Sequence, residues 1–329
     1  MPTRKRCVIL GTGSYLPDRV LTNFDLEKMV DTSDEWIVER SGIRERRIAS
    51  DDQATSDLGV PAVRNAIEDA GTKAEQIDML IVTSITPDMI FPSTACVVQS
   101  KIGLPNAACC DVVAACTGFL YSLEMGRHLV EGGSYERVIV CGAEKLSAIT
   151  DWEDRGTCVL FGDGAGAVVL GPAEGNGGVI DVYLGANGEW GDLLYLPAGG
   201  TRHPASHETV DNRMHYMKMA GREVFKHAVV EMARSIGIIL ERNGMTIDQV
   251  DCLIPHQANI RIIKALAKRI GIPIEKVFLN LETRGNMSAA ALFVAVDEAN
   301  KSGFIKKGDR VLLVGFGAGL TWGAGLIDW

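Results

Sequence analysis

The chain contains no long uninterrupted hydrophobic run and has few aromatic side chains. No stretch approaches the roughly 18 uncharged apolar residues that a membrane-spanning helix requires. The apolar run after the basic N-terminus, residues 7–10, is too short for the core of a signal peptide. Aromatic residues make up only 6% of the 329 positions, whereas 47% are hydrophobic and 36 residues are glycine. This balance predicts a globular α/β protein of the cytoplasm, without a membrane partner, and excludes fibrous and disordered chains.

The eight cysteines lack the spacing of metal ligands. None belongs to a CxxC pair, and the doublet Cys109 and Cys110 has no further ligand type beside it, so no metal site is expected. Free thiols in this number are typical of a reducing cytosol. Positive charge is also scarce, since 33 Lys and Arg face 42 Asp and Glu, which gives a net charge of −9. Nucleic acid is therefore not an expected partner, and a polyanionic partner would need a local basic patch.

Short apolar runs alternate with amphipathic patterns along the whole chain. The apolar runs predict strands at residues 7–11, 79–84, 137–142, 165–170, 250–254 and 310–315. The amphipathic patterns predict helices at residues 57–70, 118–131, 220–243, 259–270 and 288–301. Uniformly apolar strands separated by helices indicate sheets that are covered on both faces, so the predicted fold class is α/β.

A similarity between the two halves of the chain predicts a duplicated unit. The pattern at residues 76–81 returns at 249–254, and the pattern at 137–142 returns at 310–315. The spacing from 76 to 249 and from 137 to 310 is 173 residues in both cases, which favours duplication over chance similarity of strand sequences. Two halves, residues 1–174 and 175–329, would then meet face to face. A site at their join would take side chains from both halves.

Three polar residues are predicted to lie between a strand or loop and a helix. Cys116 follows an apolar run and precedes a helical pattern, so the positive end of the helix dipole is expected to lower its thiol pKa. His256 follows Pro255, which cannot donate to a central ladder, and thus stands at a strand end where α/β sheets bind ligands. Asn286 lies in a loop that leads into a helix. If each residue is considered alone, Cys116 could be an ordinary buried cysteine, His256 a buried core histidine and Asn286 a helix cap.

Several motifs, met in order along the chain, resemble those of the β-ketoacyl-acyl-carrier-protein synthase III family, the condensing enzymes that start bacterial fatty-acid synthesis. The motifs are Asp-Thr-Ser-Asp-Glu-Trp-Ile (31–37), Phe-Gly-Asp-Gly-Ala-Gly-Ala (161–167), Pro-His-Gln-Ala-Asn-Ile-Arg-Ile (255–262) and Gly-Asn-Met-Ser-Ala-Ala (285–290). The resemblance extends from Leu10 to the last Trp-Gly motif, essentially the whole chain. It implies the thiolase fold, with two pseudo-repeated α/β/α halves in a five-layered αβαβα arrangement, and a homodimer.

The resemblance also implies a reaction. An acyl-coenzyme A primer, expected to be acetyl-coenzyme A, would condense with malonyl-acyl-carrier protein to give a 3-oxoacyl-carrier protein, coenzyme A and carbon dioxide. Cys116 would accept the acyl group, and His256 with Asn286 would serve decarboxylation. The backbone N–H groups of Cys116 and Ala318, the latter in the glycine-rich stretch 315–323, would hold the oxyanion. No cofactor would be bound permanently, because the coenzyme A thioester is a substrate.

Further residues receive binding roles from the same resemblance. Coenzyme A would be bound by Trp36, Arg40, Arg155 and Asn259. Phe91 would be lent by one subunit to the acyl pocket of its neighbour. The helix predicted after His256 carries four basic residues that would dock the acidic carrier protein. Three of them are spaced i, i+3 and i+7, which places them on one face of the helix, and the fourth directly follows the last of the three. These are Arg261, Lys264, Lys268 and Arg269. The alternative to a docking surface is an ordinary helix face exposed to solvent.

Some positions depart from the family pattern, and other functions stay open at this point. Met287 stands where Thr is common, Ala291 where Ser is common and Ala318 where Gly is frequent, which leaves the pocket shape and the primer size open. The nearest rival is a related condensing enzyme of secondary metabolism with another acyl acceptor. A nicotinamide-dependent oxidoreductase has a weak signal in the glycines of residues 11–13. A further alternative is a non-catalytic acyl-coenzyme A binding protein. Such a protein would lack the nucleophile or the decarboxylating pair, whereas this chain has all three residues.

Overall fold

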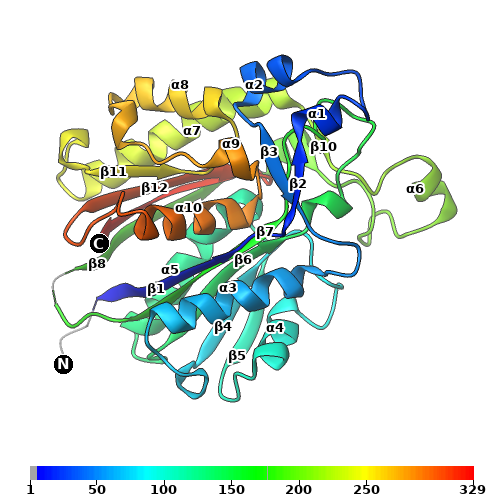
Figure 1. Ribbon diagram of the computed structural model, residues 1–329. Helices are drawn as coiled ribbons and strands as arrows, with labels where there is room; N and C mark the ends of the chain where they lie inside the picture. Colours follow the sequence, from blue (N-terminus) through cyan, green and yellow to red (C-terminus); the bar gives the residue numbers. More distant parts are fainter. Residues whose placement is uncertain (1–5, 176) are drawn as a thin grey trace.

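Two β-sheets and the helices packed on them form five layers (Figure 1). The computed structural model describes residues 6–175 and 177–329. The first sheet has the order β1-β7-β6-β4-β5 and the second has the order β11-β12-β13-β8. The first sheet consists of β1 (Cys7–Tyr15), β4 (Met79–Thr83), β5 (Ala108–Val112), β6 (Val138–Glu144) and β7 (Gly164–Pro172). The second sheet consists of β8 (Gly178–Ala186), β11 (Cys252–Pro255), β12 (Arg310–Gly317) and β13 (Thr321–Asp328).

Helices fill the space between the sheets and cover their outer faces (Figure 1). The middle layer is formed by α5 (Gly118–Glu131) and α10 (Ala289–Lys301), which contact strands of both sheets. The first sheet is covered by α3 (Thr55–Asp69) and α4 (Thr94–Ile102), and the second by α7 (Gly221–Arg242) and α8 (Ile260–Ile270). Every predicted helix is present, with ends that differ by one or two residues at most.

Smaller elements connect these layers and surround one end of the sheets. Two short two-stranded sheets are formed by β2 (Arg19–Thr22) with β3 (Glu45–Ile48) and by β9 (Leu194–Tyr195) with β10 (Lys218–Met219). The short helices are α1 (Asn23–Leu26), α2 (Asp34–Ser41), α6 (His207–Asp211) and α9 (Leu281–Arg284). The 3₁₀ turns are η1 (Ala74–Gln76), η2 (Ala115–Thr117), η3 (Leu146–Ala148), η4 (Gly188–Leu193), η5 (Ile247–Gln249) and η6 (Ile274–Lys276).

The two sheets share one strand topology. In the first sheet β6 lies between β4, which is parallel to it, and β7, which is antiparallel and pairs in turn with β1. In the second sheet β12 lies in the same way between β11 and β13, and β13 pairs with β8. The sequence similarity had predicted the equivalence of β4 with β11 and of β6 with β12. The predicted five-layered α/β arrangement is confirmed, and the proposed boundary near residue 174 falls between β7 and β8.

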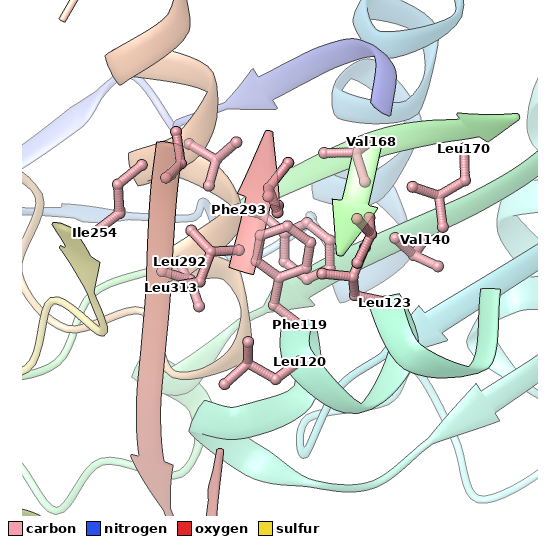
Figure 2. Packing of buried hydrophobic residues seen from close by; sticks show 14 of the residues in the cluster. Phe119, Leu120, Leu123, Val140, Val168, Leu170, Ile254, Leu292, Phe293 and Leu313 are labelled. Atoms are coloured by element: carbon pink, nitrogen blue, oxygen red, sulfur yellow. The ribbon is translucent and has the colours of Figure 1, made fainter. Parts of the chain in front are cut away.

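The two helices of the middle layer meet through a pair of aromatic rings (Figure 2). Phe119 on α5 and Phe293 on α10 are fully buried and stack with their ring centroids 4.1 Å apart. Aliphatic side chains from both sheets surround them, such as Val140 and Val168 from the first sheet and Leu313 from the second. The stack lies within one turn or two of the start of each helix, so it fixes the distance between the residues that precede α5 and α10.

The glycines of residues 11–13 lie inside strand β1 rather than in a ligand-binding turn. β1 continues through them to Tyr15 and pairs with β7 in antiparallel register. A Cβ atom at Gly11 would lie 2.3 Å from the Ala70 backbone nitrogen, and one at Gly13 would lie 2.3 Å from that of Ala66. The two glycines therefore allow close packing of α3 on the strand. The oxidoreductase interpretation loses the sequence signal on which it rested.

Candidate active site

One cavity of about 780 Å³ lies where the two halves of the molecule meet. Its lining includes Cys116, which precedes α5, and His256 and Asn286, which follow β11 and α9. Trp36 and Ala318 line the same cavity. The structure therefore brings together the three residues that the sequence selected as reacting groups, one from the first half and two from the second.

Cys116 lies in the 3₁₀ turn η2, directly before the N-terminus of α5. The preceding residue, Ala115, has a φ of 45°, which turns the chain sharply between strand and helix. The end of β12 packs against this turn, because a Cβ atom at Gly317 would lie 2.8 Å from the Cys116 backbone nitrogen. A glycine is required at position 317 for this approach. The backbone that leads to Ala318 is thereby held beside the Cys116 N–H group.

The thiol of Cys116 is buried, and its pKa differs from the expected one. A helix start was expected to lower the pKa, but burial raises the pKa of Cys116 to about 12, and the hydrogen bond to Ser288 offsets only part of this rise. The Sγ atom donates to Ser288 Oγ at 3.6 Å. The helix position was predicted correctly, whereas the predicted direction of the pKa shift was wrong. At neutral pH the thiol is protonated and has to lose its proton when it reacts.

The backbone of His256 is held at the end of β11, whereas its imidazole ring has no hydrogen-bond partner in the described part of the chain. Its N–H group donates to the Val314 carbonyl at 2.8 Å, which continues the pairing of β11 with β12. Neither ring nitrogen has a hydrogen-bond partner among the residues that the structure describes. Burial lowers the pKa of His256 to about 4, so the imidazole is neutral at pH 7. A neutral ring carries one N–H donor that a ligand in the cavity can accept.

The amide of Asn286 is oriented by a hydrogen bond to its own loop. Its Oδ1 accepts from the Ser288 backbone N–H at 2.9 Å, so the Nδ2 group is left to donate. The backbone of Asn286 pairs with Leu160 and Gly162 of the first half. This pairing ties the loop to the motif at residues 161–167. Asn286 is therefore a positioned donor and not the cap of α10, since Ser288 is the residue at that N-terminus.

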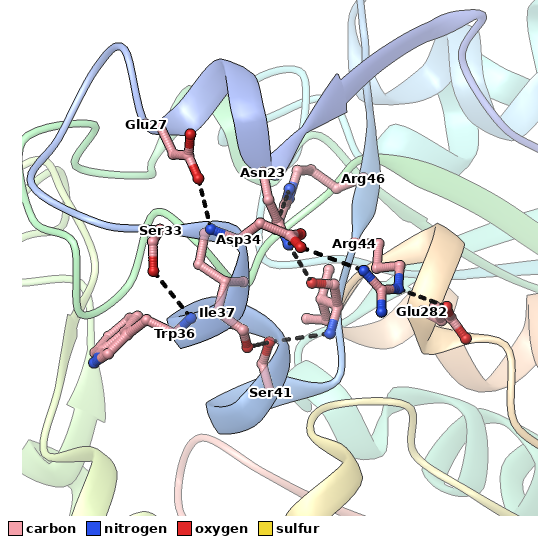
Figure 3. Close-up of polar contacts among 11 residues, drawn as sticks. Asn23, Glu27, Ser33, Asp34, Trp36, Ile37, Ser41, Arg44, Arg46 and Glu282 are labelled. Atoms are coloured by element: carbon pink, nitrogen blue, oxygen red, sulfur yellow. Dashed lines mark hydrogen bonds and ion pairs between the residues drawn. The ribbon is translucent and has the colours of Figure 1, made fainter.

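At one part of the cavity lining, Trp36 forms a cluster with two arginines. The guanidinium of Arg155 lies 5.2 Å from the Trp36 ring centroid and that of Arg40 lies 5.4 Å from it. Both arginine side chains are exposed. Ser33 caps α2, since its Oγ accepts from the Trp36 N–H at 3.2 Å (Figure 3). The aromatic face and the two cations provide the chemistry for stacking a base and binding phosphates.

Polar contacts hold the helix that carries Trp36 to the second half of the molecule (Figure 3). Asp34 Oδ1 accepts from the Asn23 amide at 2.8 Å, and Asp34 Oδ2 lies 3.4 Å from Arg44 Nη1. Arg44 in turn donates through Nε to Glu282 in α9 at 3.0 Å. The position of Trp36 is thus coupled to the segment that leads to Asn286.

Two other predicted binding residues have different surroundings. Asn259 lines the cavity, but its side chain also caps α8 through the Arg261 N–H at 2.8 Å and donates to the Arg40 carbonyl at 2.9 Å. It therefore positions Arg40 and α8 as well as lining the channel. Phe91 is 83% exposed and does not line the cavity of its own chain. The predicted acyl-pocket role of Phe91 would thus need a second subunit.

The helix after His256 presents the predicted basic side chains to solvent. Lys264, Lys268 and Arg269 are exposed on α8, and Arg261 lies beside the cavity, with its guanidinium 5.9 Å from the Phe225 ring centroid. None of the four forms an ion pair within the described part of the chain. Unpaired positive charge at the rim of the cavity is a feature that an acidic partner can recognise.

The departures from the family pattern lie mostly outside the cavity. Met287 and Ala291 are fully buried and pack with Leu16 and Val294 in a small hydrophobic cluster, and neither lines the cavity. These two residues therefore do not line the pocket, whose dependence on them the sequence had left open. Ala318 does line the cavity.

Sequence reasoning missed two polar residues near Cys116, of which Ser288 contacts the thiol directly. Ser288 accepts the Cys116 thiol hydrogen bond, and Glu144 is a fully buried carboxyl group at the end of β6. A charged residue at the end of an otherwise apolar strand was a visible signal for Glu144. Ser288 lay in a quoted motif, but the contact with Cys116 spans 172 positions and only the fold reveals it.

Comparisons with known proteins now identify the family. The 3-oxoacyl-[acyl-carrier-protein] synthase III family model matches residues 110–188, and the model of the family's C-terminal part matches residues 240–329. A β-ketoacyl-[acyl-carrier-protein] synthase III of Caldanaerobacter subterraneus is 57% identical over 98% of this chain and 97% of its own. The chain belongs to the β-ketoacyl-[acyl-carrier-protein] synthase III family. It is an acyltransferase that catalyses the condensation initiating fatty-acid synthesis, as predicted.

Other relatives and solved structures agree with this family. The Clostridioides difficile synthase III is 51% identical over 98% of both chains. The crystal structure of the Aquifex aeolicus 3-oxoacyl-[acyl-carrier-protein] synthase III has a TM-score of 0.91 and 45% identity, over 98% of this chain and all of its own. A priming β-ketosynthase of a polyketide pathway is also similar, with a TM-score of 0.91, but only 34% identical over 99% and 97% of the two chains. The higher identities favour fatty-acid synthesis over secondary metabolism.

The described residues contain neither a helix that could span a membrane nor a cluster of metal-ligand side chains. Every helix is too short or too polar to cross a membrane. In the same residues, no group of three or more His, Cys, Asp or Glu side chains is arranged to hold a metal ion.

Proposed function

We propose that this enzyme transfers an acyl group, acetyl in the first instance, from coenzyme A to Cys116 and condenses it with malonyl-acyl-carrier protein. The products are a 3-oxoacyl-carrier protein, coenzyme A and carbon dioxide. The observation that carries the proposal is the shared cavity lined by a thiol, a neutral imidazole and a carboxamide. No other cofactor is required, because the coenzyme A thioester is itself a substrate.

In the first stage the Cys116 sulfur attacks the thioester carbonyl of the primer. The backbone N–H groups of Cys116 and Ala318 donate to the oxyanion that develops. The packing of Gly317 against Cys116 supports this pairing, since it holds the two backbone segments side by side. Coenzyme A leaves, and the acyl group remains on Cys116 as a thioester.

In the second stage His256 and Asn286 stabilise an enolate. The neutral His256 ring and the Asn286 Nδ2 group both donate to the thioester carbonyl of the malonyl group as carbon dioxide departs. Neither side chain is a proton acid at neutral pH, so the enolate is not quenched before it attacks the acyl-Cys116 carbonyl. A carboxylate at either position would repel the developing charge.

The substrates approach through the part of the cavity near α2 and α8. Trp36 with Arg155 and Arg40 binds the adenine and phosphates of coenzyme A, and Asn259 supports Arg40 from behind. The acidic carrier protein docks on Arg261, Lys264, Lys268 and Arg269, and its prosthetic arm enters the same cavity. The absence of ion pairs at these four residues, within the described chain, supports a partner of opposite charge.

The double variant Lys264→Glu/Lys268→Glu tests the docking surface. It is expected to raise KM for malonyl-carrier about tenfold at low salt, since each lost surface charge contact is worth up to ~1 kcal/mol. The rate of acylation by acetyl-coenzyme A should not change. The measurement is steady-state condensation against carrier concentration, with single-turnover acylation followed by mass spectrometry.

The control for this pair is Lys306→Glu/Lys307→Glu, which changes net charge equally. These exposed lysines precede β12, at the end of the strand opposite Gly317 and the cavity. An equal rise of KM in both double variants would show a general charge effect and would contradict docking on α8.

A homodimer of the cytoplasm completes the proposal. Phe91 and Ile90 are each 83% exposed, and Val113, after the edge strand β5, is 78% exposed. Large apolar side chains this exposed, next to a sheet edge that pairs with no other described strand, favour burial against a second subunit. Phe91 of one subunit would then reach the acyl pocket of the other.

Product analysis tests the whole proposal. Purified enzyme is incubated with malonyl-carrier and a panel of acyl-coenzyme A primers, and the carrier is analysed by mass spectrometry. With acetyl-coenzyme A, the expected products are acetoacetyl-carrier, coenzyme A and carbon dioxide in equal amounts. A malonyl-carrier that stays unchanged with every primer would contradict the proposal, whereas a preference for another primer would revise only the acetyl assignment.

A further inference from the structure

Two threonine hydroxyls join the turn that carries Cys116 to the loop that carries Ala318. Thr117 directly follows Cys116 in η2, and Thr321 is the first residue of β13. Their Oγ1 atoms lie 2.7 Å apart, at hydrogen-bond distance, across 204 positions of the sequence. Thr117 is fully buried, and Thr321 is partly buried. Neither threonine lines the cavity, so neither hydroxyl is placed to touch a substrate.

Each hydroxyl also contacts the backbone of its own segment. Thr117 Oγ1 lies 2.7 Å from the Ala114 carbonyl oxygen, and Thr321 Oγ1 lies 3.1 Å from the Ala318 carbonyl oxygen. When Thr117 donates to Thr321, the proton of Thr321 is free for the Ala318 carbonyl. When Thr321 donates to Thr117, the proton of Thr117 is free for the Ala114 carbonyl. In both arrangements the bond between the hydroxyls joins the two segments.

The joined segments carry the two backbone N–H groups assigned to the oxyanion. Within the described residues neither the Cys116 N–H nor the Ala318 N–H forms a backbone hydrogen bond, and both residues line the cavity. Gly317 pairs with Thr321 in the register of β12 and β13, so residues 318–320 form a short loop between the strands. Packing against Cys116 fixes Gly317, and the Thr321 hydroxyl contacts the Ala318 carbonyl. The peptide groups on both sides of Ala318 are thus restrained, as an oxyanion donor requires.

The hydroxyl pair supplies what packing alone does not. Cys116 and Ala318 belong to different halves of the molecule, so the separation of their N–H groups depends on how the halves meet. The contact of Gly317 with Cys116 limits how closely the segments approach, but each van der Waals contact is weak and gives little direction. A hydrogen bond is directional. Thr117 and Thr321 therefore fix the sideways position that packing leaves free.

We propose that Thr117 and Thr321 are positioning residues for the acylation step. Their hydroxyls hold the N–H groups of Cys116 and Ala318 at the separation that the oxyanion requires. The inference rests on the proposed function, in which these two N–H groups bind the oxyanion. Without the hydroxyl bond the loop of Ala318 can shift relative to Cys116, and a displacement of about 1 Å can slow a reaction by about 10²-fold. Coenzyme A binds at Trp36, so its affinity should not change.

The experiment measures single-turnover acylation of Cys116 against acetyl-coenzyme A concentration, read by mass spectrometry of the intact protein. Thr321→Val replaces the hydroxyl by a methyl group, so the maximal acylation rate should fall about 10²-fold with an unchanged half-saturating concentration. Thr117→Val leaves the contact of Thr321 with the Ala318 carbonyl in place, so its loss should be smaller. The double variant should be no slower than Thr321→Val, because both changes remove the same bond. Thr321→Ser keeps the hydroxyl and should keep the rate.

Thr94→Val is the matched control. Thr94 is fully buried at the start of α4 and does not line the cavity, and its hydroxyl has no hydrogen-bond partner in the described part of the chain. This variant should acylate like the unmodified enzyme. Malonyl decarboxylation, which depends on His256 and Asn286, should be unchanged in every variant.

An unchanged maximal acylation rate in Thr321→Val overturns the inference, even where Thr117→Val does not fold. An equal loss in Thr321→Ser also overturns it, because the shape of the side chain and not its hydroxyl would then matter. The same holds for a rise of the half-saturating concentration alone, and for an equal loss of decarboxylation, which would show a general disturbance of the cavity. Losses that multiply in the double variant would contradict a shared bond. Failure of the unmodified enzyme to form any acyl-enzyme would instead contradict the proposed function.

Discussion

Replacement of Cys116 by alanine is expected to lower the condensation rate by on the order of 10⁶-fold, as loss of a nucleophile does in other covalent catalysts. The variant should form no acyl-enzyme when it is mixed with acetyl-coenzyme A, because no other described residue that lines the cavity has a thiol. Intact-protein mass spectrometry checks this directly, since acetylation adds a fixed mass to a single chain. Malonyl decarboxylation should persist, because it depends on His256 and Asn286.

A buried cysteine from elsewhere in the fold provides the control. Cys252 lies in β11, is 2% exposed and belongs to the hydrophobic core. Cys252→Ala should therefore acylate normally, with at most a modest loss of stability. An acyl-enzyme of the usual mass in Cys116→Ala would assign the acyl group to another residue and end the proposed mechanism.

Substitution of His256 or Asn286 by alanine is expected to separate the two stages. Each variant loses one donor to the enolate oxygen, so malonyl decarboxylation should fall about 10²- to 10³-fold. Acylation of Cys116 by acetyl-coenzyme A should stay measurable in both. Radiolabelled carbon dioxide release from malonyl-carrier measures the first quantity, and mass spectrometry of the protein measures the second.

The pH dependence of decarboxylation tests the state of the imidazole. The pKa of His256 is lowered to about 4, and the neutral ring is the one that acts, so the rate should be constant from pH 8 down to pH 5 and fall only near pH 4. A fall centred near pH 6.5 would contradict a buried neutral ring. His128→Ala and Asn300→Ala are the matched controls for the His256 and Asn286 substitutions, and both should decarboxylate malonyl-carrier normally. His128 is exposed on α5, and Asn300 forms a hydrogen bond to Thr12 outside the cavity.

The order of the fold could be predicted well because its signals are local. The helix at residues 118–131 matches α5 at both ends, and the spacing of 173 residues anticipated the shared topology of the two sheets. Strand ends were less certain. β1 continues four residues beyond its predicted end at Gly11, because the glycines that suggested a turn serve to pack α3 against the strand.

The active site could be predicted only in part. Cys116, His256 and Asn286 were selected because each precedes or follows a strand or helix end that the sequence shows, and the structure places all three in one cavity. Burial is a tertiary property, so the sequence could not reveal that the Cys116 thiol would have a raised pKa despite its helix position. The contact between Cys116 and Ser288 joins segments from different halves, and no spacing in the sequence connects them.

The stack of Phe119 and Phe293 joins a helix of the first half to a helix of the second half. Phe119 lies three residues after Cys116, and Phe293 lies five residues after Ser288, so the stacked rings hold together the two helices that these residues precede. A smaller side chain at either ring would let the helices settle closer or shift along each other. Such a change is expected to disturb the hydrogen bond between Cys116 and Ser288, although neither ring lines the cavity.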